Sequence, residues 1–103
     1  MFELKGTKIR HTRGDTGVLR FSPRVDGDDL IEYTAVLSIK QSPNAKQYVV
    51  QKECVNNKFI FDHEDTNELK PGGYVWDIEV RTPGGQYYTV GPYQYIVLAD
   101  VTR

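Results

Sequence analysis

The sequence predicts an all-β fold, a single domain over residues 1–103 in which about seven short strands pack as two antiparallel sheets. Two observations lead to this prediction. Apolar residues alternate with polar residues in several short segments, whereas the apolar spacing of a helix never continues beyond one turn. Turn-forming residues separate these segments at intervals of roughly 8–12 residues. A chain of 103 residues is long enough to bury a core without disulfides.

The clearest predicted strands are Tyr74–Arg81 and Tyr33–Lys40. In the first, every second residue from Tyr74 is apolar, and the residues between them are mostly charged. In the second, the alternate residues from Tyr33 are apolar, and the opposite side is largely polar. A strand with one apolar and one polar side is half-buried in an antiparallel sheet, so the apolar sides of both strands are expected to line the core.

The other predicted strands are shorter or less regular. They cover Lys8–Thr12, Gly17–Ser22, Gln47–Val55, Lys58–Asp62 and a long last strand made of Gln86–Val90 and Tyr93–Leu98. Both sides of Gln47–Val55 are mixed, which favours a position at the edge of a sheet. Pro92 follows Gly91 within the last strand and removes one donor from the ladder, which predicts a bulge or a change of sheet there.

Turn signals lie between these segments. Asn56–Asn57 predicts a tight type I′ hairpin turn, because asparagine tolerates a positive φ. The other expected turns and polar loops are Gly14–Gly17, Arg24–Asp29, Gln41–Lys46 and Pro83–Gly85. Asp62–Leu69 is the one segment that suits a single helical turn, with Asp65 or Thr66 as its cap.

One motif narrows the fold class. Leu69–Tyr74 contains a leucine, a Pro-Gly turn and a tyrosine that opens a strand. This is the layout of a tyrosine corner, in which the tyrosine hydroxyl donates a hydrogen bond to the backbone a few residues upstream. The expected architecture is therefore an immunoglobulin-like antiparallel β-sandwich of about seven strands, with Leu69, Tyr74 and Trp76 as structural residues.

The composition excludes several classes of partner. With 13 Lys and Arg against 14 Asp and Glu, the formal net charge is -1, so no basic face for nucleic acid is expected. No apolar run is long enough to span a membrane, and residues 1–13 lack the apolar stretch of a signal peptide. The single cysteine, Cys54, cannot form an internal disulfide, which suits a reducing compartment and a small half-buried side chain.

Four features invite a functional interpretation, and a structural explanation is favoured for each. Asp26–Asp29 lacks the spaced ligands of a calcium loop and suits a solvated turn. Asp62–Asp65 lacks further ligands at zinc spacing, since His11 is the only other histidine, and suits a polar loop. Cys54 has no histidine near it in sequence to activate a thiolate. Arg13–Asp15 spells the integrin-recognition tripeptide but also suits a turn. We therefore expect a non-enzymatic protein with no catalytic residue, cofactor or metal.

The tyrosines are the least ordinary feature of the sequence. Four of the seven crowd the last predicted hairpin, namely Tyr87, Tyr88, Tyr93 and Tyr95. Neighbouring residues of a strand face opposite ways, so Tyr87 and Tyr88 cannot both be buried by the same packed face. One of them is expected to be an ordinary surface residue, part of a protein interface, or a platform for a sugar ring. The four tyrosines are the candidate interaction residues.

Four segments carry a family resemblance: RGDTGVLRF at Arg13–Phe21, YTAVLSIKQS at Tyr33–Ser42, the region Asp65–Val90 with its L-x-P-G-x-Y pattern, and VLADVTR at Val97–Arg103. In this order they resemble the N-terminal domain of phage baseplate upper proteins and related small tail modules of phages and prophages of Gram-positive bacteria. The resemblance covers most of the chain and lies in structural motifs. It implies a β-sandwich that docks a receptor-binding or fibre part onto the tail, with symmetric copies around an axis.

The expected function is that of a non-enzymatic structural or assembly module of a phage or prophage tail of the baseplate type. Expected partners are other tail or baseplate proteins and further copies of the chain in a symmetric oligomer, joined through sheet faces or through an edge such as Gln47–Val55. Nucleic acid and membranes are not expected partners. Such a protein is made in the bacterial cytoplasm and located in the virion. The alternative is a carbohydrate-binding or adhesion module that uses Tyr88, Tyr93 or Tyr95.

Overall fold

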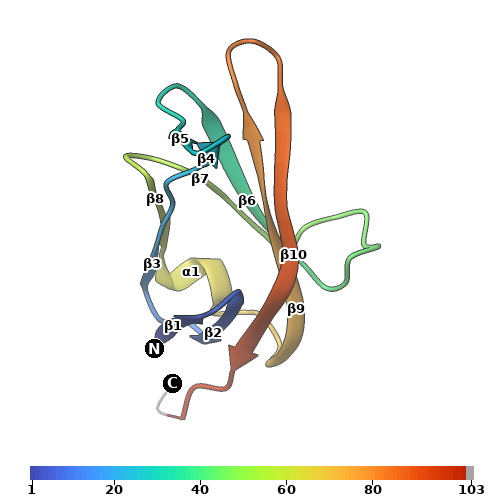
Figure 1. Ribbon diagram of the computed structural model, residues 1–103. Coiled ribbons are helices and arrows are strands. Elements are labelled where there is room, and N and C mark those ends of the chain that lie inside the picture. Colours follow the sequence, from blue (N-terminus) through green and yellow to red (C-terminus); the bar gives the residue numbers. More distant parts are fainter. Residues whose placement is uncertain (102–103) are drawn as a thin grey trace.

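The structure is a computed structural model that describes residues 1–101, and its regular elements are almost all strands (Figure 1). The prediction of an all-β fold is therefore confirmed. The elements within residues 1–101 are, in chain order, β1 (Phe2–Lys5), β2 (Lys8–Thr12), β3 (Gly17–Arg20), β4 (Arg24–Val25), β5 (Asp28–Asp29), β6 (Thr34–Lys40), β7 (Val50–Glu53), β8 (Lys58–Phe61), α1 (His63–Thr66), β9 (Gly72–Arg81) and β10 (Tyr87–Leu98).

Most of the strands form one large mixed sheet in the order β1-β2-β10-β9-β6-β7. Strand β10 is antiparallel to β9 and parallel to β2, and Tyr95 of β10 is the register partner of Ile9 in β2. Strands β3 and β8 form a separate antiparallel pair that faces the large sheet, and β4 and β5 form a small hairpin near one end of that pair (Figure 1). The strands of the described chain thus lie in two facing layers.

The core lies between these layers and consists of alternate apolar residues of their strands. The large sheet contributes Ile9, Ala35, Leu37, Ile39, Val50, Tyr74, Trp76, Ile78, Val80, Tyr95 and Val97, and the β3–β8 pair contributes Leu19, Phe59 and Phe61. Burying one large apolar side chain stabilises a fold by about 1.5–3 kcal/mol. The alternation seen in the sequence therefore supplies the main driving force that holds the two layers together.

The predicted strands correspond to β2, β3 and β6 to β10, with ends that shift by a few residues. The segment Gln47–Val55 contains β7, which is an edge of the large sheet as expected. The two halves of the last predicted strand form one continuous β10. Its register with β9 shifts between Val90 and Tyr93, which is the bulge expected at Gly91–Pro92.

The strands differ from the sequence prediction in two places. Phe2–Lys5 forms β1, a strand that sequence patterning did not indicate because it is short and mostly exposed. Arg24–Asp29 was expected to be a polar loop, and this is wrong, because the segment forms the β4–β5 hairpin. Asp26 and Gly27 have φ values of 53° and 85°, so this Asp-Gly pair makes the tight turn that joins the two strands.

The tight turn predicted at Asn56–Asn57 is present. Both asparagines have positive φ, at 53° and 60°, and the flanking residues Val55 and Lys58 exchange backbone hydrogen bonds of 2.8 and 3.1 Å. The turn follows β7 of the large sheet and leads into β8 of the opposite layer. It therefore places Val55 beside β8.

The helical turn expected within Asp62–Leu69 is present as α1, but its cap is not the one expected. Asp62 precedes the helix with extended backbone angles (φ -98°, ψ 167°), and its N–H donates a 2.7 Å hydrogen bond to the Asp65 carboxylate. Thr66 is the last helical residue and is buried. The N-cap residue is therefore Asp62 and not Asp65 or Thr66, because the helix begins at His63, and the Asp65 side chain takes part in the cap from within the helix as the second member of a capping box.

The tyrosine corner has the expected hydrogen bond. The Tyr74 hydroxyl donates to the carbonyl oxygen of Lys70 at 2.7 Å, while its ring lies in the core. Leu69 is half-buried and packs against that core. Trp76 is buried as well, and its Nε1 donates to the carbonyl oxygen of Thr7 at 3.0 Å. These bonds fix the start of β9 against the α1–β9 connection and the β1–β2 turn.

Tyr74→Phe is expected to lower the free energy of unfolding by about 1 kcal/mol, because it removes one partly buried hydrogen bond and leaves the Lys70 carbonyl without that donor. The measurement is the urea midpoint followed by tryptophan fluorescence. Tyr87→Phe is the matched control, since the Tyr87 side chain is exposed, and it is expected to leave the midpoint unchanged. Equal midpoints for Tyr74→Phe and the wild type would contradict a stabilising corner.

Candidate functional site

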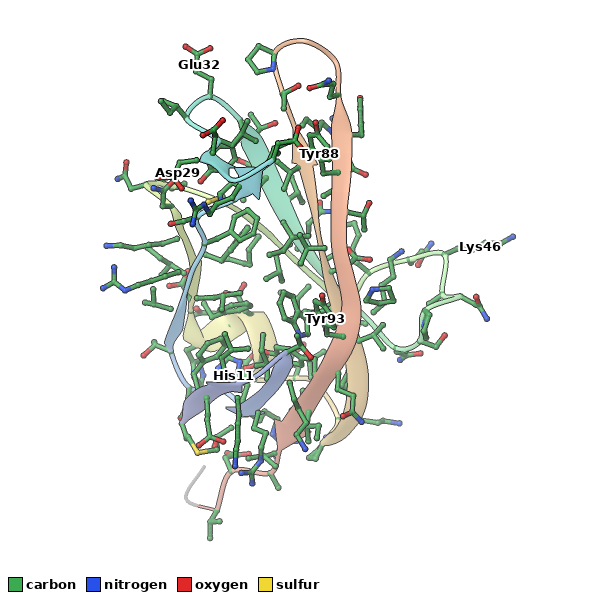
Figure 2. The ribbon with its side chains drawn as sticks, viewed as in Figure 1. His11, Asp29, Glu32, Lys46, Tyr88 and Tyr93 are labelled. Carbon is green, nitrogen blue, oxygen red and sulfur yellow. The ribbon has the colours of Figure 1, made fainter. Side chains whose placement is uncertain are left out.

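The four clustered tyrosines separate into one exposed and three inward-facing residues. Tyr95 is fully buried, and Tyr88 and Tyr93 are partly buried against the core, on the inner side of β10 (Figure 2). Tyr87 is 63% exposed, so Tyr87 and Tyr88 do face opposite ways. The expectation of a surface platform made of Tyr88, Tyr93 or Tyr95 is therefore not supported by their burial, because alternation directs Tyr93 and Tyr95 inward and the bulge between Val90 and Tyr93 brings Tyr88 onto the same side.

Tyr87 lines a surface hollow, which we call the Tyr87 hollow, together with Tyr33, Thr34, Arg81, Thr82, Pro83 and Gly85. The Arg81 guanidinium lies 5.2 Å from the centre of the Tyr87 ring and is held by a 2.8 Å hydrogen bond to Glu79. This bond also raises the pKa of Arg81 above its ordinary value. A shallow depression of about 360 Å³ adjoins the Tyr87 hollow on the outer side of the large sheet. This depression is lined by Thr34, Val36, Ser38, Lys40, Gln51, Asp77, Glu79, Arg81 and Thr89.

Strand β7 presents a sheet edge whose backbone is available to another chain. The N–H of Cys54, just after β7, donates to the carbonyl oxygen of Ala35 at 2.9 Å. Backbone groups alternate in direction along an antiparallel strand, so the N–H groups of Gln51 and Glu53 point away from β6. Both of these residues are exposed. An edge of this kind can accept an added strand from a partner.

His11 forms a buried polar contact between β2 and β10. Its Nε2 lies 2.7 Å from the carbonyl oxygen of Asp15, which only accepts, so Nε2 donates there. Its Nδ1 is then the acceptor for the Tyr95 hydroxyl at 2.5 Å. Burial first, and then the charge of the amino terminus, lower the pKa of His11 from 6.5 to about 4, although Asp65 acts in the opposite direction. The neutral imidazole is thus a structural group with both nitrogens bonded.

All three residues of the tripeptide Arg13–Asp15 make polar contacts with other segments of the chain. Its arginine lies 2.7 Å from the Asp100 carboxylate, and its aspartate forms an ion pair with the amino terminus. Its glycine is held by α1, because the glycine N–H donates to Thr66 Oγ1 at 2.8 Å and the glycine carbonyl accepts from His63 Nδ1 at 2.8 Å. These contacts support the turn interpretation over integrin-type recognition, which needs an exposed tripeptide.

The acidic clusters and Cys54 are the other candidates for a metal or nucleophilic site. No group of three or more histidine, cysteine and carboxylate side chains in that range is placed to hold a metal ion. The Cys54 sulfur is half-buried, 3.9 Å from the Tyr33 hydroxyl. The same residues contain no helix that is both long and apolar enough to cross a membrane.

No family model matches the chain, and no curated protein or solved structure matches it either. The geometry on its outer surfaces is therefore the basis for a functional proposal. Two of these surfaces, the β7 edge and the Tyr87 hollow, contain residues singled out in the sequence.

Proposed function

We propose that this chain is a non-enzymatic assembly module of a phage or prophage tail of the baseplate type, located in the virion and bound to other tail or baseplate proteins. The observation that carries the proposal is the exposed β7 edge, where the backbone N–H groups of Gln51 and Glu53 point away from β6. Main-chain hydrogen bonds to such an edge give affinity without catalytic groups. The resemblance to baseplate upper proteins supplies the tail context.

The edge is accompanied by apolar side chains that suit an interface. Tyr48 and Val49 precede β7 and are 53% and 36% exposed. The loop that contains them protrudes from the outer side of the large sheet (Figure 1). A strand added along β7 would therefore contact apolar side chains as well as backbone groups, and exposed apolar residues next to open edges are typical of binding surfaces.

The test uses the phage or prophage that encodes the chain. Gln51→Pro removes an outward N–H, Gln51→Ala is the matched control that keeps it, and thermal melts of the purified chains verify folding. Particles are purified on a density gradient, and the chain is quantified by mass spectrometry relative to the main tail protein. We expect wild type and Gln51→Ala at equal ratios, with Gln51→Pro reduced at least about tenfold.

Two results would contradict different parts of this proposal, namely the tail function and the docking site. Absence of the wild-type chain from purified particles contradicts the tail function itself. Normal incorporation of a folded Gln51→Pro chain contradicts docking at β7. Val49→Pro is not a suitable variant, because the Val49 N–H already donates to the carbonyl oxygen of Ile39 at 2.7 Å, and its loss weakens the sheet.

We further propose that the fold is an immunoglobulin-like β-sandwich. The adjacent strands β6, β9 and β10 of the large sheet suit the C, F and G strands of that fold, and the β3–β8 pair suits strands B and E. The tyrosine corner supports this reading, since Tyr74 opens β9 after the turn from α1, where strand F begins in immunoglobulin domains. The remaining short strands then extend this framework beyond seven.

A second candidate function, carbohydrate binding or adhesion, is favoured by the Tyr87 hollow. An exposed tyrosine ring beside hydroxyl, amide and charged side chains is a suitable surface for a sugar. Isothermal titration with cell-wall polysaccharide from a Gram-positive host is the test. Binding that is lost in Tyr87→Ala and kept in Tyr48→Ala would support it, and no heat of binding with the wild type would exclude that polysaccharide.

A further inference from the structure

The outer side of the β3–β8 pair exposes apolar side chains beside two cations. Val18 and Ile60 are direct cross-strand partners, and each is 49% exposed. Val55 pairs with Lys58 on the other side of β8 and is 58% exposed. Register partners share a face, so these three apolar residues lie together with Arg20 and Lys58. We call this surface the basic apolar face: Val18, Arg20, Val55, Lys58 and Ile60.

The two cations of this face lack a counter-charge within the described chain. Arg20 and Lys58 are direct cross-strand partners, and like charges in that position repel each other. Neither forms an ion pair with a carboxylate of residues 1–101. The surface therefore favours a partner that brings both an apolar side chain and negative charge.

The chain itself carries a segment of that chemistry. The segment Asp26–Glu32, which we call the acidic tip, contains four carboxylates and follows a single arginine, Arg24. Arg24 lies 3.3 Å from one of them, Asp29. Within the tip, Ile31 is 89% exposed, which is unusual for an isoleucine. Glu32 lies at one end of the molecule, with its side chain directed away from the body of the fold (Figure 2).

The tip does not cover the face of its own chain, because Ile31, Val18 and Ile60 are all exposed together. We propose that the acidic tip of one copy docks on the basic apolar face of another copy, with Ile31 packed against Val18 and Ile60 and the carboxylates near Arg20 and Lys58. The contact uses two different surfaces, so it is heterologous and builds rings or filaments. This contact rests on the proposed assembly function and specifies one partner for it, a second copy of the chain.

The experiment uses the purified chain and light scattering after size-exclusion chromatography over a concentration series. Ile31→Asp disables the tip, Ile60→Asp disables the face, and Val101→Asp is a control at an apolar residue that is 97% exposed and lies outside both surfaces. We expect the wild type and Val101→Asp to associate, and each disabled variant to show an apparent Kd raised at least about tenfold. Association is also expected to weaken as salt is raised, because charges contribute to it.

The decisive measurement mixes the two disabled variants. Ile31→Asp keeps an intact face and Ile60→Asp keeps an intact tip, so an equimolar mixture is expected to form a 1:1 dimer and nothing larger. A mixture that stays monomeric overturns the proposal, and so does a monomeric wild type at about 1 mM. Neither result bears on incorporation of the chain into particles, which separates failure of this inference from failure of the tail function.

Discussion

Gly91→Ala is expected to destabilise the chain by about 3 kcal/mol, because backbone strain and crowding act together at this position. Gly91 has a φ of 101°, which residues with a side chain rarely adopt. A Cβ built there would lie 2.9 Å from the carbonyl oxygen of Trp76 and 3.3 Å from Cα of Asp77, which are backbone atoms of β9. The bulge in β10 therefore requires glycine, and urea unfolding measures the cost of replacing it.

Gly85→Ala is the matched control for this prediction. Gly85 has a similarly positive φ of 83°, but a Cβ there would meet nothing within 4 Å. We expect this variant to lower the free energy of unfolding by only about 1 kcal/mol, which is the cost of the backbone strain without the crowding. If both variants lower the free energy of unfolding equally, close approach between β10 and β9 is not the reason that glycine occupies position 91.

The second large effect is expected on acidification. Because the folded chain holds the pKa of His11 at about 4 and the unfolded chain leaves it near 6.5, the unfolded state binds more protons between these values. Stability is therefore fully present above about pH 6.5 and is lost progressively as the pH falls to about 4. One pKa unit corresponds to about 1.4 kcal/mol, so the full contribution is on the order of 3 kcal/mol.

Two measurements check the role of His11. Its imidazole proton shift, followed by NMR, is expected to titrate near pH 4, and a midpoint near 6.5 would contradict the buried neutral state. In denaturant unfolding, His11→Gln is expected to flatten the pH dependence of stability between 6.5 and 4.

The parts of the fold that the sequence revealed are those where alternation directly reports burial. In β6 and β9 one side is buried and the other polar, so Tyr33–Lys40 and Tyr74–Arg81 were recognisable with their faces. The turn at Asn56–Asn57 was also predictable from local sequence, because its positive φ angles suit asparagine. By contrast, β4 and β5 are only two residues long and mostly exposed, so they leave no periodic signal.

The candidate surfaces depend on contacts between distant residues and were less visible. Burial of His11 follows from Tyr95, which lies 84 positions later, although the alternation of Ile9 and His11 placed both on one side of β2. Alternation within β10 likewise groups Tyr93, Tyr95 and Val97 on the inner side, so the sequence pattern itself already indicates that Tyr93 and Tyr95 face the core. The basic apolar face requires the pairing of Val18 with Ile60, which no local pattern specifies.

The position of β10 between β2 and β9 has a consequence for how the chain folds. Residues 95–98 pair with residues 9–12, so the parallel ladder joins segments from opposite ends of the described chain. Contacts at such sequence separation slow folding, because a long loop must close before they form. Until β10 is in place, β2 and β9 are both open edges and Ile9 has no cover from Tyr95. We therefore expect late, cooperative closure of the large sheet, and a partly synthesised chain that depends on chaperones to remain unaggregated.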